Sequence, residues 1–113
     1  MKDVKHREMA GGRWWKLTLA EQLGNVGSEV SRALKWRSRD PRIAQGALER
    51  ALELIDLTLA DPRHRRSVAR LREIARAREV LLDFLVGPNQ YGSTAAGLQR
   101  YFDAYAVAAS RRR

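Results

Sequence analysis

Hydrophobic residues recur at intervals of three and four along most of the chain, the spacing that places side chains on one face of an α-helix. Four segments carry such a stripe, at residues 18–36, 41–60, 63–86 and 93–110. The first stripe consists of Leu19, Leu23, Val26, Val30 and Ala33. Because no segment alternates strictly between apolar and polar residues, the pattern predicts four helices and no β-strand.

Sequence signals for helix ends support these four segments. Thr18 followed three residues later by Glu21 matches a capping box, and Asp40 before a proline is a favourable N-cap. Short connections make consecutive helices antiparallel. We therefore predict an all-α protein, an antiparallel up-down-up-down four-helix bundle over residues 14–113, preceded by a flexible leader at residues 1–13.

Small residues line the face of the first predicted helix beside its apolar stripe, and they allow two interpretations. Ala20, Gly24, Gly27 and Ser31 would let a neighbouring backbone approach a continuous helix closely. Alternatively, the chain breaks at the glycines, and residues 18–37 form a helix-turn-helix of a DNA-binding transcriptional regulator. A turn at the glycines would favour the second interpretation.

The charge balance indicates the class of partner. The chain of 113 residues has 22 Lys and Arg against 13 Asp and Glu, a formal net charge of +9. Such an excess favours a polyanion, most often nucleic acid, and the guanidinium fork suits phosphate. Trp36 is a possible stacking residue for a base, although it could instead cap the core. The predicted binding residues are Arg63, Arg65, Arg66, Arg70, Arg72 and Arg76, then Arg32, Lys35, Arg37 and Arg39, and the tail Arg111, Arg112 and Arg113.

One arginine occupies a position in the third stripe where leucine would be expected. Folding the four predicted helices at their turns brings Arg78 to the level of Glu29 and Glu49. We therefore predict a partly buried structural ion pair between Arg78 and one of these glutamates. The other possibility is that Arg78 lies at the edge of the seam and extends to water.

The sequence offers little for catalysis. It has no cysteine, and its two histidines, His6 and His64, lack partners at spacings typical of metal or nucleophile sites. It contains no phosphate-binding GxxxxGK[ST] motif. We expect a protein that is not an enzyme and binds no metal or cofactor. Because no signal sequence or membrane-spanning run is evident, we expect it in the cytoplasm.

The predicted helices, the basic balance and the run QLGNVGSEVSR together resemble a family of small four-helix bundles. That family includes ribosomal RNA intervening-sequence proteins and the accessory variability determinants of diversity-generating retroelements. The resemblance covers roughly residues 14–110, and the family's Asn-Ile-Ala-Glu-Gly run is replaced here by residues 25–29, NVGSE. It implies a homo-oligomer, plausibly a pentameric ring, without catalytic residues. It also implies binding to a reverse transcriptase and its template RNA.

Overall fold

A computed structural model describes residues 12–111, and within that range the chain is helical with no strand. The prediction of an all-α, bundle-like protein is confirmed at this level. The leader predicted at residues 1–13 lies outside the described range except for its last two residues, as do Arg112 and Arg113. The four helices of seven or more residues are α2 (Leu19–Trp36), α3 (Pro41–Leu59), α4 (Val68–Leu85) and α5 (Ala95–Arg111).

The first two helices begin where the capping signals predict. The Thr18 hydroxyl accepts a hydrogen bond from the Glu21 amide at 3.1 Å, and the Glu21 carboxylate accepts one from the Thr18 amide at 2.9 Å. The Asp40 carboxylate accepts from the Arg42 amide at 3.1 Å. These bonds satisfy amides that have no partner within their own helix, and they fix both helix starts.

The third predicted helix is wrong at its start. Instead of a continuous helix from Arg63, a 3₁₀ turn, η1 (His64–Arg66), precedes an extended Ser67. The Ser67 hydroxyl accepts from the Arg70 amide at 3.2 Å, so it caps a separate α4. The hydrophobic spacing alone did not reveal this break, because the break falls before the first residue of the stripe.

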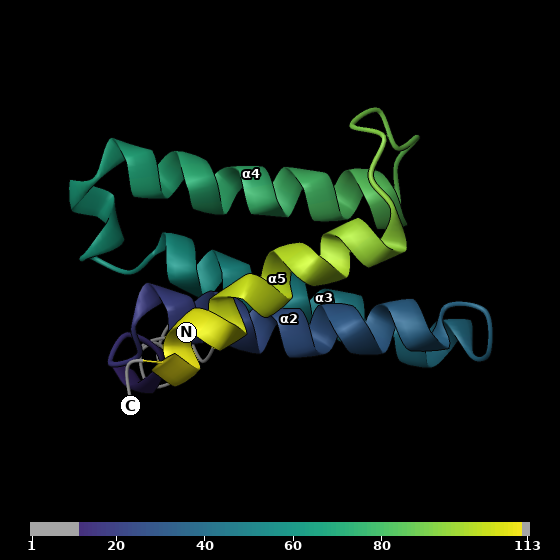
Figure 1. Ribbon diagram of the computed structural model, residues 1–113, viewed down its shortest axis with the longest axis horizontal. Helices are drawn as coiled ribbons and strands as arrows, with labels where there is room; N and C mark the ends of the chain where they lie inside the picture. Colours follow the sequence, from purple (N-terminus) through teal and green to yellow (C-terminus); the bar gives the residue numbers. More distant parts are fainter. Residues whose placement is uncertain (1–11, 112–113) are drawn as a thin grey trace, which may run out of the picture.

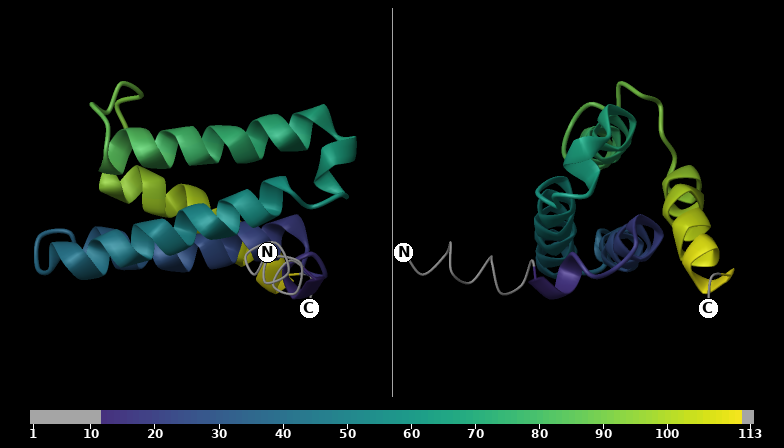
Figure 2. Two further views of the ribbon diagram at one scale, coloured as in Figure 1. Left: turned by 180° about the vertical axis from the view of Figure 1, so that it is seen from behind. Right: turned by 90° about the vertical axis from the view of Figure 1, so that its left-hand side faces the viewer.

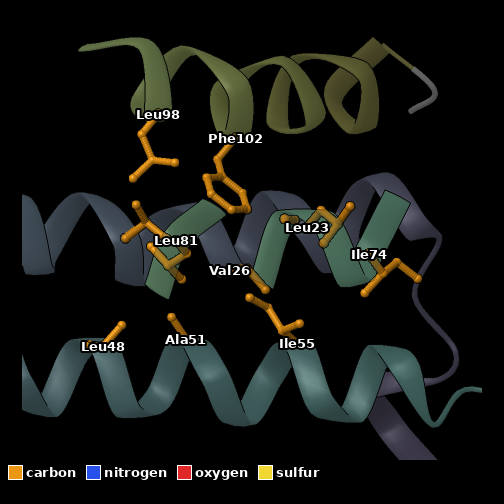
Figure 3. Close-up of a cluster of buried hydrophobic side chains, with 11 residues drawn as sticks. Leu23, Val26, Leu48, Ala51, Ile55, Ile74, Leu81, Leu98 and Phe102 are labelled. Carbon is orange, nitrogen blue, oxygen red and sulfur yellow. The ribbon is translucent and has the colours of Figure 1, made fainter. Parts of the chain in front are cut away.

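The helices pack side by side, with α2 between α3 and α5 and with α4 against α3 (Figures 1 and 2). A loop over residues 86–94 carries the chain from α4 to α5. Each helix directs part of its predicted stripe into one core (Figure 3). The fully enclosed members of that core include Leu23, Val26, Val30, Ala51, Ile55, Ile74, Leu81 and Phe102.

The small-residue face of α2 contacts α5 within the same chain. α2 is continuous through both glycines, so the alternative interpretation of residues 18–37 as a helix-turn-helix is wrong. A Cβ atom at Gly27 would lie 2.7 Å from the Cβ atom of Phe102, and one at Gly24 would lie 3.1 Å from the Cα atom of Ala106. A side chain at Gly27 would therefore displace Phe102 or separate α2 from α5, because the Phe102 side chain already occupies that space.

None of the helices within residues 12–111 is long and apolar enough to cross a membrane.

Candidate nucleic-acid interface

Four predicted binding residues lie exposed on η1 and on the outer side of α4. Arg72 and Arg76 are one turn apart on α4, opposite the side that buries Ile74 and Leu81. Arg65 and Arg66 are exposed on η1. Within residues 12–111, these four side chains make no ion pair with a carboxylate at 4.0 Å or less. We refer to Arg65, Arg66, Arg72 and Arg76 as the outer arginine cluster.

The acidic side chains of α4 accept hydrogen bonds from α5 and from the loop after α4. Glu73 accepts a hydrogen bond from the Tyr105 hydroxyl on α5, and Glu79 accepts one from the Tyr91 hydroxyl at 3.0 Å. Asp83 accepts from the backbone amides of Gln90 and Tyr91 at 2.8 and 3.0 Å. These contacts engage the carboxylates of α4 with α5 and the 86–94 loop, and Glu79 and Arg76 both lie at Tyr91. Among residues 12–111, none of these carboxylates forms an ion pair at 4.0 Å or less with the outer arginine cluster.

Two other predicted binding residues already have partners within the protein. The Arg63 guanidinium contacts the buried Asp61 carboxylate at 2.6 Å and donates to the Leu17 carbonyl. Arg70 lies 3.4 Å from the Nδ1 atom of His64. The predicted basic stripe therefore divides into two groups. Arg63 and Arg70 contact Asp61 and His64 within the protein, and the other four arginines form the outer arginine cluster.

A second basic surface lies in a groove between α2 and α3. Arg32 lines it together with Arg42 and Arg50, two residues that were not among the predicted binding residues. The groove has a volume of about 180 Å³, with Gly46 in its wall. Arg50 pairs with Glu29 at 3.0 Å, and Arg42 lies 3.8 Å from Asp40. These carboxylates partly offset the positive charge of the groove.

The groove and the outer arginine cluster lie on different sides of the molecule. The hollow on the α4 side of the α2–α3 pair is lined by Ala33, Leu48 and Leu85, whereas the groove residues follow the opposite edge. Arg37, another predicted binding residue, instead contacts α4, because its guanidinium lies 5.1 Å from the centre of the Phe84 ring. The structure therefore does not join the predicted residues into one continuous track. Among the remaining predicted binding residues, Lys35, Arg39 and Arg111 are exposed and Trp36 is half-buried.

The predicted partners of Arg78 are wrong. Its Nε atom donates to Asp56 on α3 at 2.9 Å. Glu29 pairs with Arg50 instead, and Glu49 accepts from Gln45 at 3.3 Å. Counting helical levels placed Arg78 near these glutamates, but it could not show which edge of α3 faces α4. Both members of the observed pair remain partly exposed, at 36% and 56% of the side chain.

A buried polar network beneath the outer arginine cluster was not predicted. The Gln22 amide nitrogen donates to the Trp14 carbonyl and to the Asp61 carboxylate, both at 3.0 Å. The Gln22 oxygen therefore accepts from Nε2 of His64 at 2.6 Å. This arrangement gives a neutral imidazole whose Nδ1 atom faces Arg70. It ties η1 to the starts of α2 and α4, and so fixes the base of the arginine cluster.

The network holds two titratable groups in defined states. Burial lowers the pKa of His64, an effect that Asp61 opposes and that Arg63 and Arg70 reinforce. Burial alone would raise the pKa of Asp61, but hydrogen bonds from Arg63 and Gln22 outweigh it and lower that pKa to about 2. At neutral pH the network thus contains an ionised Asp61 and an uncharged His64.

Comparison with known proteins does not assign this chain to a family: no family model, curated protein or solved structure matches it significantly. Within the described residues, no group of three or more His, Cys, Asp or Glu side chains is placed to hold a metal ion. The exposed arginines and their surroundings are the features of this chain that bear on its function.

Proposed function

We propose that this protein is a non-enzymatic nucleic-acid-binding protein that contacts phosphates through the outer arginine cluster. The observation that carries the proposal is a set of exposed arginines without a carboxylate partner among residues 12–111. The carboxylates of α4 bind tyrosine hydroxyls and loop amides, whereas Arg65, Arg66, Arg72 and Arg76 are exposed and form no ion pair at 4.0 Å or less within residues 12–111. A guanidinium in this state can donate two parallel hydrogen bonds to phosphate.

This surface suits the phosphate backbone more than the edges of bases. It consists of charged side chains spread along one exposed helix face and its preceding turn, without a projecting helix that would enter a groove. Binding should therefore depend weakly on sequence and strongly on salt, because each neutralised phosphate releases counterions. The formal charge of +9 would also accelerate association of the protein with nucleic acid.

A narrower role follows only from the family resemblance. We propose that the four helices form an up-down-up-down bundle that assembles into a ring-like homo-oligomer of five subunits. The ring would act as accessory to the reverse transcriptase of a diversity-generating retroelement, binding the enzyme and its template RNA. Light scattering tests the assembly: a pentamer has five times the chain mass of 12.9 kDa. A monomer at micromolar concentration would contradict the ring.

The binding proposal is tested by fluorescence anisotropy with a labelled single-stranded oligonucleotide over a range of salt concentrations. Changing Arg65, Arg72 and Arg76 together to Gln should weaken binding and flatten the salt slope. Loss of three phosphate contacts lowers the magnitude of that slope by about 2 for single strands.

The control removes the same charge outside the cluster, by changing Arg32 and Arg42 of the groove together with the exposed Arg39 to Gln. If binding uses the outer arginine cluster, this variant should retain most of the affinity and the slope. Equal losses in both variants would mean that only the overall charge matters. Absence of binding by the unmodified protein at low salt would refute the function itself and would favour an acidic protein partner.

A further inference from the structure

A cavity of about 340 Å³ lies between α4, α5 and the loop that joins them. Its volume is at the lower end of the range typical of small-ligand sites. Small residues create the space, since Ala77 on α4 and Gly97 on α5 are both in its wall. The remaining lining residues are Arg76, Val80, Gly92, Ser93, Thr94, Leu98 and Tyr101.

The loop wall of this cavity is held by its own hydrogen bonds. The Asn89 side chain donates to the Ser93 carbonyl at 2.9 Å and accepts from the Ser93 amide at 2.8 Å. Asn89 itself has a positive φ of 57°. Asp83 on α4 binds the amides of the two residues after Asn89, which ties the loop back to the helix. The cavity therefore has a preformed wall that does not depend on a bound ligand.

The lining combines an apolar floor with an aromatic and cationic rim. Val80 and Leu98 supply aliphatic surface, and Tyr101 is 38% exposed. Arg76 belongs both to the cavity and to the outer arginine cluster, and its guanidinium lies 5.4 Å from the centre of the exposed Tyr91 ring. A planar apolar group attached to an anion would match this arrangement, with the plane inside and the anion at Arg76.

We propose that the cavity takes one unstacked base of a single-stranded nucleic acid, while Arg76 contacts an adjacent phosphate. This inference rests on the proposed nucleic-acid binding and adds a base-binding site to a surface that otherwise contacts only phosphates. Tyr101 and Tyr91, rather than Trp36, are then the aromatic residues that meet the nucleic acid. The site explains why a basic helix face lies beside an open cavity rather than a filled helix seam.

The test compares a labelled homopolymer of thymidine with an abasic strand of the same length at one salt concentration. A base held in the cavity should make the thymidine strand bind about five-fold or more tightly, the effect of stacking one base. Equal affinity for the two strands would overturn the inference but leave the proposed function standing. Failure of both strands to bind would overturn the two together. Free thymidine monophosphate binding as tightly as the strand would instead assign the cavity to a free nucleotide.

Variants locate the effect in the cavity. Ala77→Leu fills it, and we expect it to abolish the preference for the thymidine strand while the salt slope stays unchanged. Ala104→Leu makes the same change on the exposed side of α5 and should retain the preference. If circular dichroism shows that Ala77→Leu does not fold, Val80→Phe fills the same space. A preference that survives in a folded, filled variant would contradict the proposed site.

Discussion

Gly27 and Gly46 allow the packing of α2 against α5 to be measured with a single chemical change. Both glycines lie inside helices, where replacing glycine by alanine favours the helix by about 1 kcal/mol. At Gly46 a new methyl group meets no atom within 4 Å, so Gly46→Ala should stabilise the protein by about that amount. At Gly27 the methyl group would lie 2.7 Å from the Cβ atom of Phe102, whose side chain is fully buried.

The steric cost decides the sign at Gly27. Carbon atoms in contact normally lie about 3.5–4.0 Å apart, so α2 and α5 must separate or Phe102 must leave its position. Overpacking of this kind costs about 1–3 kcal/mol, which cancels or exceeds the gain in helix propensity. We therefore expect Gly27→Ala to be neutral or destabilising by up to about 2 kcal/mol, and the two variants to differ by about 1–3 kcal/mol.

Urea denaturation followed by circular dichroism measures both free energies of unfolding, and thermal melting supplies an independent comparison. A difference of 1 kcal/mol corresponds to roughly 4 °C in Tm for a chain of this size. The reasoning would be refuted if Gly27→Ala stabilised the protein as much as Gly46→Ala does. In that case the small-residue face of α2 would not contact Phe102, and the position of α5 against α2 would be incorrect.

Further variants test the core, the Arg78 pair and the buried network. Ile55→Ala should destabilise the protein by about 2–5 kcal/mol, measured by urea denaturation, because it empties part of a fully enclosed site. Arg78→Leu should cost less than about 1 kcal/mol in the same assay and leave oligonucleotide affinity unchanged, since its pair with Asp56 is partly exposed. Because burial lowers the pKa of His64 in the folded state, its contribution to stability is complete above the unfolded pKa of 6.5 and falls as the pH drops below it. His64→Gln should therefore show a smaller loss of stability than the unmodified protein between pH 7 and pH 5; an equal loss would contradict the neutral buried imidazole.

Sequence patterns predicted the helices well because each helix contains its own signals. The spacing of Leu23, Val26 and Val30 defines a buried face without reference to the rest of the chain. Thr18 and Asp40 mark helix starts through hydrogen bonds to amides only a few residues away. Such local interactions can be recognised in a sequence, and the structure has them where they were expected.

The surroundings of the arginines could not be predicted in the same way, because they depend on contacts between distant segments. Arg63 and Arg66 look alike in sequence, yet only Arg63 meets a buried carboxylate and the Leu17 carbonyl. His64 is buried by contact with Gln22, 42 residues away. The one available signal was Asp61 just before a proline and an arginine, which indicates a capped turn but not its burial.

The central claim is that Arg65, Arg66, Arg72 and Arg76 contact nucleic-acid phosphate, and arginine-specific modification tests it most directly. The protein would be treated with phenylglyoxal, with and without a saturating single-stranded oligonucleotide, and each arginine quantified by mass spectrometry. Two exposed arginines outside the cluster, Arg39 and the groove residue Arg42, serve as internal controls. We predict that the bound oligonucleotide protects the outer arginine cluster and leaves the control arginines as reactive as before. Protection of Arg39 and Arg42 with an unprotected outer arginine cluster would contradict the claim.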